Sequence, residues 1–310
     1  MTSVEIILPY YNGSAFIKEQ IESILKSDLV GINLSIILIN DASNFEETEY
    51  VKKLLPPNHI YIENEANIGV IKSVEKGLMM SSARYVMLCD HDDVWLPEKI
   101  KNSVREIKET EGDSIAMVYS DLVICGPNLE KIHPSMLASS GFRSDKVYPS
   151  IIYRNIVTGC TIIMNRKLVE FSLPFPNELP MHDHWLAACA VFAGKVSLLK
   201  EPTILYRQHG QNQIGAKGET VLCKILNYKR TIEKFQNHLR LKCEMASALV
   251  LRLSEHNLHH ESFFVKRIAR ALHNRDALYL IRNRILRGDL IRVFGDIVLL
   301  TYLRNLKKSK

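Results

Sequence analysis

The chain has 310 residues, of which 46% are hydrophobic and 24% are charged. This composition is ordinary for a globular protein and excludes a disordered or collagen-like chain. No apolar run reaches about 18 residues, so no transmembrane helix is predicted. The first three residues lead directly into an apolar run over residues 4–8, without the basic and apolar regions of a secretory signal. We therefore expect a cytoplasmic protein.

The charge is distributed unevenly along the chain. Residues 221–310 contain 19 Lys and Arg against 7 Asp and Glu, a net charge of +12. The remaining residues, 1–220, carry a net charge of −6. Such asymmetry indicates a polyanionic neighbour for the C-terminal third, either nucleic acid or an anionic membrane.

The first 120 residues alternate between two hydrophobic patterns. Apolar runs typical of strands occur at 4–8, 34–39, 60–62, 85–89 and 115–119. Helical spacing of apolar residues lies between them at 17–25, 50–55 and 70–78, and Pro97 is expected to open a fourth helix through Lys108. This order predicts an α/β fold with a mostly parallel sheet and helices on both faces.

The rest of the chain predicts fewer strands and more helix. Strands are expected at 162–164 and 196–199, a helix at 183–192, and a continuous basic helical region from about residue 220. We place the boundary near 215–220, where two glycines and the charge shift coincide. The predicted domains are a catalytic domain over 1–218, with halves 1–120 and 121–218, and a helical basic region over 219–310.

Polar clusters follow four successive predicted strands, at residues 9–13, 40–43, 64–69 and 90–93. One such cluster would be an ordinary loop, but four at successive strand ends describe a ligand site, because ligands of parallel sheets bind beyond the carboxyl ends of the strands. The chain has neither a G-x-G-x-x-G after the first strand nor a P-loop motif. Dinucleotide binding and P-loop chemistry are therefore disfavoured.

The cluster Asp90-His91-Asp92-Asp93 is the most informative. Three crowded carboxylates repel one another unless a cation or hydrogen-bond donors are present, and Mg²⁺ or Mn²⁺ would relieve that repulsion. The alternative is a solvated acidic turn in which Asp93 caps the helix opened by Pro97. We assign the capping role to Asp93 and the metal-ligand role to Asp92. The six cysteines form no C-x-x-C pair and are expected to be buried thiols, Cys160 among them.

Six motifs occur in an order that resembles the inverting family 2 glycosyltransferases of GT-A fold, in particular bacterial rhamnosyltransferases. They are Leu8-Pro9-Tyr10-Tyr11-Asn12, Asn40-Asp41-Ala42-Ser43, Asn67-Ile68-Gly69, Asp90-His91-Asp92-Asp93-Val94-Trp95, Met181-His182-Asp183-His184-Trp185 and Tyr206-Arg207-Gln208-His209-Gly210. Together they cover residues 4 to about 215. The resemblance implies a Rossmann-like GT-A domain that binds a nucleotide-sugar.

The resemblance also implies roles for donor-binding residues. The residues expected to contact the nucleotide-sugar are Pro9, Tyr10, Asn12, Asp41, Asn67, Asp90 and Arg207. Arg207 would neutralise phosphate charge, and Asp90 would hold the ribose. Two readings of Asn67 stay open, donor contact or the N-cap of the next helix. His91 departs from the residue expected at its position and is interpreted as a neutral turn residue.

Metal and catalytic roles follow from the same resemblance. Asp92 and His209 are the expected ligands of Mn²⁺ or Mg²⁺, although residues 206–210 could equally be a surface loop. Asp183 corresponds to the catalytic base, which must take the proton of the acceptor hydroxyl during in-line displacement. From spacing alone, Asp183 would instead be an acid that caps a helix.

Four residues are expected on the acceptor side: Thr158, Gly159, His182 and Trp185. Trp185 is expected to stack on the acceptor sugar, with core packing as the alternative.

The expected reaction is inverting transfer of a sugar, dTDP-L-rhamnose being the first candidate donor and a UDP-hexose the second. The expected acceptor is a glycan or lipid-linked glycan in bacterial surface polysaccharide synthesis. Nucleic-acid binding by the basic region is a weaker alternative, since residues 221–310 have few aromatic residues and no recognised motif.

A basic amphipathic helix is predicted near the C-terminus. Residues 290–306 place Ile291, Phe294, Val298 and Tyr302 at helical spacing beside several Arg and Lys residues. Such a helix can lie in the headgroup layer of an anionic membrane, which predicts peripheral attachment to the inner face of the cell membrane. The alternative is packing against the catalytic domain or against the second subunit of a homodimer.

Overall fold

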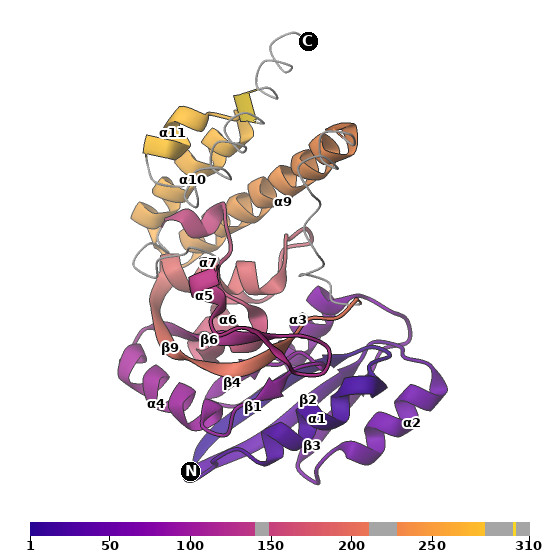
Figure 1. The fold of residues 1–310 in the computed structure, drawn as a ribbon. Helices are drawn as coiled ribbons and strands as arrows, with labels where there is room; N and C mark the ends of the chain where they lie inside the picture. The colour runs from indigo at the N-terminus through magenta and orange to yellow at the C-terminus, as the bar shows by residue number, and fades with distance from the viewer. Residues whose placement is uncertain (140–148, 211–227, 283–299, 302–310) are drawn as a thin grey trace. The chain divides into compact units, whose positions relative to one another are not determined.

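In a computed structural model of the chain, the structure describes residues 1–139, 149–210, 228–282 and 300–301. Figure 1 shows the helices and strands of these residues along the chain. The chain divides into two compact units. Unit 1 comprises Met1–Ser140, Val157–Phe175 and Gly194–Gly210; unit 2 comprises Gly141–Ile156, Pro176–Ala193 and Gln211–Lys310. The predicted boundary near 215–220 lies outside the described residues.

Unit 1 is built on one sheet of nine strands in the order β3-β2-β1-β4-β8-β6-β9-β5, with β7 paired to β6. The strands are β1 Thr2–Tyr10, β2 Ile32–Asn40, β3 His59–Glu63, β4 Tyr85–Leu88, β5 Val94–Trp95, β6 Ile115–Cys125, β7 Lys131–His133, β8 Ile163–Asn165 and β9 Gly194–Arg207. Strands β3, β2, β1 and β4 are parallel to one another, and β6 is parallel to β9. The predicted mostly parallel sheet is confirmed.

Helices pack on both faces of this sheet, as predicted. The helices of unit 1 are α1 Ser14–Leu25, α2 Phe45–Leu54, α3 Val70–Met80, α4 Lys99–Glu111, α5 Met136–Ser139 and α6 Arg166–Ser172. Buried residues of α1, α2 and α4 share one core cluster with Ile6 and Leu8 of β1. Gly77 of α3 lies against Ile7 and Ile39, which point to the opposite face because side chains alternate along a strand.

One prediction about helix α4 is wrong. The helix begins at Lys99, its N-cap position is Glu98, and no side chain caps it. Asp93, the expected cap, lies before strand β5, whose residues Val94 and Trp95 pair with β9. This short strand separates the acidic loop from the helix, so the Asp93 carboxylate is available for other partners.

Unit 2 contains four α-helices in its described part: α7 His182–Ala193, α9 Tyr228–Glu255, α10 His259–His273 and α11 Ala277–Arg282. A helical C-terminal region is thus present, as predicted. No helix within residues 228–282 combines the length and the apolar character needed to cross a membrane. Most of the predicted amphipathic helix over 290–306 lies outside the described residues.

Two histidines at the start of α7 are buried in unit 2. His182 and His184 are 6% and 3% exposed. His184 Nε2 lies 2.5 Å from the carbonyl oxygen of Ile151, and a neutral imidazole must donate its proton there. Burial lowers the pKa of each histidine to about 4. Both are therefore neutral near pH 7.

The start of β9 generates a stability prediction. A Cβ at Gly194 would lie 2.2 Å from the carbonyl oxygen of Ile115, a backbone atom of the paired strand β6. We expect Gly194→Ala to destabilise the protein by about 1–3 kcal/mol, because the strands must move apart. Urea unfolding followed by tryptophan fluorescence measures the change. Gly210→Ala is the matched control, since a Cβ there would meet no atom of the described residues within 4 Å. Equal stability of the two variants would contradict the strand contact.

The buried histidines predict a pH dependence. The unfolded chain takes up protons near pH 6.5, whereas His182 and His184 in the folded chain take them up only near pH 4. Stability should therefore be greatest above pH 6.5 and fall as the pH drops towards 4. Each histidine accounts for about 1–2 kcal/mol between pH 7 and 5.

Calorimetric unfolding at pH 7 and pH 5 checks this dependence. His184→Gln keeps an amide that can donate to Ile151 but does not titrate, so the difference between the two pH values should shrink. His260→Gln, at an exposed position on α10, should leave the difference unchanged. The same pH dependence in His184→Gln as in the unmodified chain would show that His184 does not produce it.

Candidate active site

The sheet brings the predicted polar clusters to one edge of unit 1. Tyr10 and Asn40 are paired at the ends of the parallel strands β1 and β2, and β4 runs in the same direction. Strand β8 is antiparallel to both β4 and β6, so β6 and its parallel partner β9 also end at this edge. The loops after β1, β2 and β4 therefore lie on the same side as Arg207 at the end of β9.

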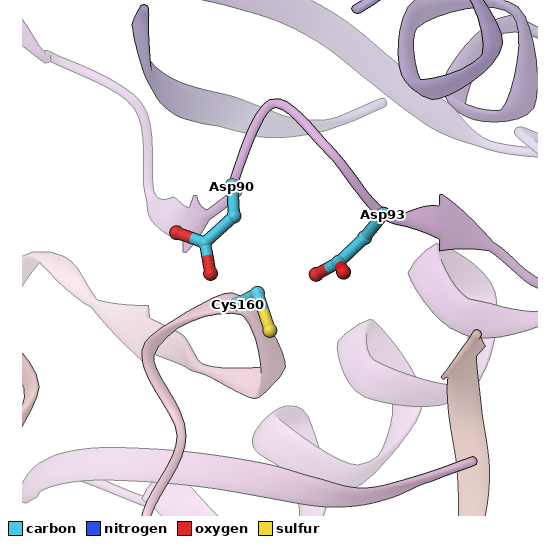
Figure 2. Close-up of side chains that lie close together, drawn as sticks. All are labelled: Asp90, Asp93 and Cys160. Atoms are coloured by element: carbon cyan, nitrogen blue, oxygen red, sulfur yellow. The ribbon is translucent and has the colours of Figure 1, made fainter. Parts of the chain in front are cut away.

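Two carboxylates and a thiol point towards one another at this edge. Asp90, Asp93 and Cys160 each offer a ligand atom, and these atoms all lie within 4.8 Å of one another (Figure 2). Asp93 is fully buried; its Oδ1 accepts the backbone N–H of Arg207 at 3.0 Å, and its Oδ2 is a buried oxygen without a hydrogen-bond partner among the described residues. Burial, followed by the charges of Asp90 and Asp92, raises the pKa of Asp93 well above its usual range.

This donor set fits a hard divalent cation. Carboxylate oxygens are the preferred ligands of Mg²⁺ and Mn²⁺, and an orphaned buried carboxylate oxygen would gain a partner from such an ion. Burial and the nearby Asp93 and Asp90 carboxylates raise the pKa of the Cys160 thiol well above its usual range. With two carboxylates and a single thiol, the set lacks the several Cys and His ligands of a typical zinc site.

A buried lysine lies beneath the acidic loop. The Lys99 ammonium is completely buried, 4.7 Å from the centre of the Trp95 ring. Burial lowers its pKa to about 8, while attraction to Cys160, Cys89 and Asp93 acts in the opposite direction. At neutral pH the ammonium stays charged and offsets part of the carboxylate repulsion.

Asp92 and His209, the two expected metal ligands, are brought together. His209 Nε2 lies 2.9 Å from Asp92 Oδ2, and both side chains are largely buried. The His209 ring also stacks on Phe16 of α1, with ring centres 4.6 Å apart. Asp92 is not part of the Asp90, Asp93 and Cys160 group. The loop after β4 therefore contributes carboxylates to two sets of side chains that could bind a cation, one completed by Cys160 and the other by His209.

The loops expected to contact the nucleotide are tied to each other. Asn12, whose φ is +45°, accepts the backbone N–H of Asn44 through Oδ1 at 3.1 Å, and its own N–H donates to Ser43 Oγ at 3.0 Å. The Tyr10 hydroxyl donates to Glu47, which also accepts the Ser14 N–H at 2.9 Å. Pro9, the remaining expected residue here, is half-buried at the end of β1. These bonds fix the loop after β1 against the start of α2.

Asp41 is buried and holds the turn that precedes α3. Its Oδ1 accepts the Asn64 amide at 2.8 Å and the Ile68 N–H at 2.9 Å, and its Oδ2 accepts the Gly69 N–H at 2.8 Å. Asn67 is exposed in this turn, and the N-cap position of α3 is Gly69, which has no capping side chain. The N-cap reading of Asn67 is therefore wrong, and donor contact stays a prediction.

His91 packs directly on the loop after β1. A Cβ at Gly13 would lie 2.3 Å from His91 Cδ2, so only glycine leaves room for the ring. Burial lowers the pKa of His91, which favours the neutral ring. This packing joins the acidic loop to the nucleotide-binding loops and agrees with a neutral turn residue.

The acceptor-side residues fall in both units. Thr158 and Gly159 of unit 1 lie at the 3₁₀ turn Gly159–Thr161, where the Thr158 hydroxyl contacts Met136 Sδ at 3.5 Å. Asp183 is in the first turn of α7 in unit 2, where its Oδ1 accepts the Asn155 amide at 2.9 Å.

The other two residues expected on the acceptor side, His182 and Trp185, are also buried. His182 Nδ1 has no hydrogen-bond partner among the described residues. Trp185 is 0% exposed, with the Arg252 guanidinium 5.9 Å from its ring centre, a position that matches the core-packing alternative.

Sequence reasoning missed three acids and bases of the site: Glu19, Glu47 and Lys99. Glu19 and Lys99 lie on amphipathic helices, where charged residues usually face solvent, and nothing in their spacing marks them. Glu47 had a signal, because Asn44-x-x-Glu47 is a capping pattern and Asn44 does accept the Glu47 N–H at 3.0 Å. The Glu47 carboxylate, however, turns to Tyr10 and Ser14.

The sequence of the chain is similar to those of several glycosyltransferases. The chain is 24% identical to the dTDP-rhamnosyl transferase RfbG of Shigella flexneri, over 66% of this chain and 73% of that protein. It is 24% identical to the UDP-Glc:alpha-D-GlcNAc-diphosphoundecaprenol beta-1,3-glucosyltransferase WfgD of Escherichia coli, over 56% of this chain and 65% of that protein. An uncharacterised glycosyltransferase of Rickettsia bellii is 23% identical over 80% of this chain, which spans 36% of that longer protein. The chain spans 51% of a second rickettsial relative, from Rickettsia prowazekii.

Solved structures show the same fold. The structure of Staphylococcus aureus TarS in complex with UDP-GlcNAc matches with a TM-score of 0.54 at 19% identity, over 85% of this chain and 73% of that one. The mannosyltransferase PcManGT of Pyrobaculum calidifontis, in complex with GDP-Man and Mn²⁺, matches with a TM-score of 0.51 at 13% identity, over 98% and 87% of the two chains. The family model of glycosyl transferase family 2 matches residues 5–170, more than half of the sequence. The chain belongs to glycosyl transferase family 2.

Proposed function

We propose that the protein is an inverting, metal-dependent glycosyltransferase that moves a sugar from a nucleotide-sugar to a glycan or lipid-linked glycan. The observation that carries the proposal is the cluster of carboxylates at the end of β4, where the half-buried Asp90 lies close to the buried Asp93 and the buried Asp92 pairs with His209. Such a cluster is suited to a divalent ion with a bound diphosphate. The family match supports the same reaction class.

Specific residues take the steps of this reaction. Asp92 and His209 would hold Mn²⁺ or Mg²⁺, with Asp90 and Asp93 beside them, and the bound ion would neutralise charge on the departing diphosphate. Tyr10, Asn12 and the turn held by Asp41 would orient the nucleoside. Asp183 would accept the proton of the acceptor hydroxyl, and the Asn155 amide holds its Oδ1 in place.

The donor is proposed to be dTDP-L-rhamnose, with a UDP-hexose as the second candidate. Similarity to a dTDP-rhamnosyl transferase and to a UDP-glucose transferase at the same 24% identity supports both. The acceptor is proposed to belong to bacterial surface polysaccharide synthesis, since WfgD is named for a diphosphoundecaprenol-linked acceptor.

Peripheral attachment to an anionic membrane surface is proposed from charge. Residues 221–310 carry a net charge of +12, and each Lys or Arg near such a surface contributes about 1 kcal/mol. A lipid-linked acceptor would be met at that surface. Packing of the helix predicted over residues 290–306 against the catalytic domain or a second copy of the chain is the alternative.

Donor binding should depend on a divalent ion held through Asp92. Thermal-shift measurements with dTDP-, UDP- and GDP-sugars and Mn²⁺ identify the donor, because ligand binding stabilises the native state by mass action. With that donor's nucleoside diphosphate, calorimetric titration of Asp92→Ala should lose the Mn²⁺-dependent part of the affinity. Asp113→Ala, an exposed carboxylate before β6, should bind as the unmodified chain does. If the unmodified chain keeps its full affinity for the nucleoside diphosphate in EDTA, the proposal is contradicted.

Asp183→Asn should slow the reaction without weakening donor binding. The amide keeps the shape of the carboxylate but cannot accept the proton, so kcat should fall by roughly 10²–10⁴. Release of nucleoside diphosphate, with glycan acceptors or with water, measures the rate, and calorimetry measures donor affinity. If the variant keeps most of its rate, the base is another residue, and His182 is the next to test.

A further inference from the structure

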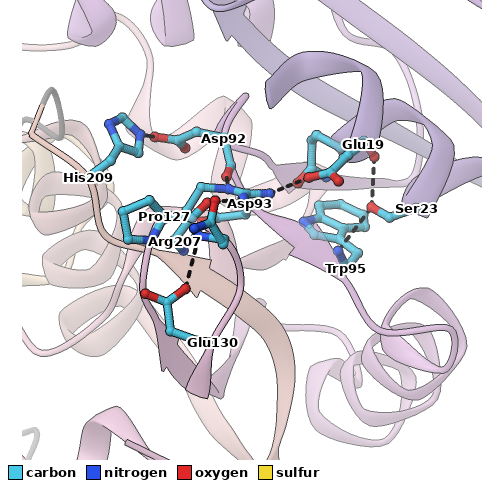
Figure 3. Close-up of polar contacts among 11 residues, drawn as sticks. Glu19, Ser23, Asp92, Asp93, Trp95, Pro127, Glu130, Arg207 and His209 are labelled. Atoms are coloured by element: carbon cyan, nitrogen blue, oxygen red, sulfur yellow. Dashed lines mark hydrogen bonds and ion pairs between the residues drawn. The ribbon is translucent and has the colours of Figure 1, made fainter. Parts of the chain in front are cut away.

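Arg207 at the end of β9 is a buried cation whose donors point at protein acceptors. Its side chain is 4% exposed. Nε donates to the carbonyl of Asp92 at 2.8 Å, Nη1 to the carbonyl of Pro127, and Nη2 to Glu19 Oε2 at 2.5 Å (Figure 3). The guanidinium therefore connects three segments: the acidic loop, the turn after β6, and helix α1.

Glu19 contributes a negative charge to the surroundings of Arg207. Two of the acceptors just named are neutral carbonyls, whereas Glu19 is a carboxylate whose side chain is 58% exposed. A buried guanidinium without a negative charge nearby is strongly disfavoured. The planar guanidinium group of arginine also matches the geometry of a carboxylate better than the ammonium group of lysine does. The pair thus places its anion at the surface and its cation in the interior.

The same face of α1 also fixes His209. Phe16 and Glu19 are three residues apart and therefore lie on one side of the helix. The Phe16 ring lies 4.8 Å from the Arg207 guanidinium and stacks on the His209 ring. His209 in turn reaches the Asp92 carboxylate at 2.9 Å. Helix α1 therefore acts on Asp92 by two routes. Glu19 holds Arg207, which donates to the Asp92 backbone, and Phe16 holds His209, which pairs with the Asp92 side chain.

We propose that Glu19 and Arg207 are a positioning pair for the cation- and diphosphate-binding loop, an inference that rests on the proposed function. Arg207 acts through the Asp92 backbone and not by direct contact with the diphosphate. Glu19 keeps the guanidinium turned to the loop. The geometry of Asp92 towards a divalent ion therefore depends on a residue of α1 that touches neither ion nor donor.

Calorimetric titration with Mn²⁺ and the nucleoside diphosphate tests the pair. Glu19→Gln should weaken the Mn²⁺-dependent affinity roughly 5- to 30-fold, the range expected for one or two kcal/mol. Binding of the nucleotide in EDTA should not change, and this split separates positioning from general damage to the fold. Glu22→Gln is the matched control, one turn along the same helix and paired with Lys18 and Lys26.

Arg207→Lys should show the same selective loss, and the double variant should be no weaker than Arg207→Lys, because paired residues act non-additively. If Glu19→Gln does not fold, Phe16→Leu removes the ring beneath Arg207 and His209 and should give the same loss. Unchanged or tighter Mn²⁺-dependent binding in Glu19→Gln would overturn the inference, since a freed Arg207 would then be contacting the diphosphate. Lack of Mn²⁺-dependent binding in the unmodified chain would instead contradict the proposed function.

Discussion

The crowding of carboxylates at the end of β4 is the constraint on which the rest of unit 1 depends. Asp90, Asp92 and Asp93 lie within four residues, and Asp93 is completely buried. Burial, followed by the charges of Asp90 and Asp92, raises the pKa of Asp93 well above its usual range, because carboxylates held this close repel one another. The fold accommodates these three carboxylates in the loop that follows β4, and cationic groups close to this loop offset part of their repulsion. Lys99 lies beneath the loop, and Arg207 donates to it from both backbone and side chain.

Other acids at the same edge hold loops by accepting backbone N–H groups. Asp41 fixes the turn before α3, and Glu47 fixes the loop after β1. These carboxylates have their partners inside the protein and shape the edge before any ligand arrives. A preorganised edge loses less conformational entropy on binding, which favours tight recognition of a charged ligand. Asp90, Asp92 and Asp93 differ from these acids because they lie within four residues of one another, so a cation would relieve their mutual repulsion.

Much of this arrangement could be predicted from the sequence, and the exceptions have physical causes. Apolar runs located the parallel strands because a strand buried on both faces is hydrophobic throughout, and the motif order indicated the family. The capping role assigned to Asp93 failed because the two-residue strand β5 is too short to leave a pattern. The contact of Glu19 with Arg207 spans 188 residues of sequence, and no local period encodes such a pair. Trp185 is predicted in both of its possible roles, because a tryptophan in the core and one that stacks on a sugar can occupy the same position in the sequence motif.

The pairing of strand β9 with β6 determines where Arg207 lies relative to the carboxylates after β4. It pairs with β6 from Gly194 to Arg207, and the register shifts around Asp121 set which side of β9 each later residue faces. A slip of one residue would turn the Arg207 side chain to the opposite face and remove it from Asp92. The Asp121 carboxylate holds the irregular stretch by accepting the N–H groups of Leu122 and Leu137 at 2.8 Å and 3.2 Å. The buried Asp121 carboxylate thus holds the irregular stretch of β6, and the pairing of β9 with β6 carries Arg207 to the end of the sheet where the carboxylates after β4 lie.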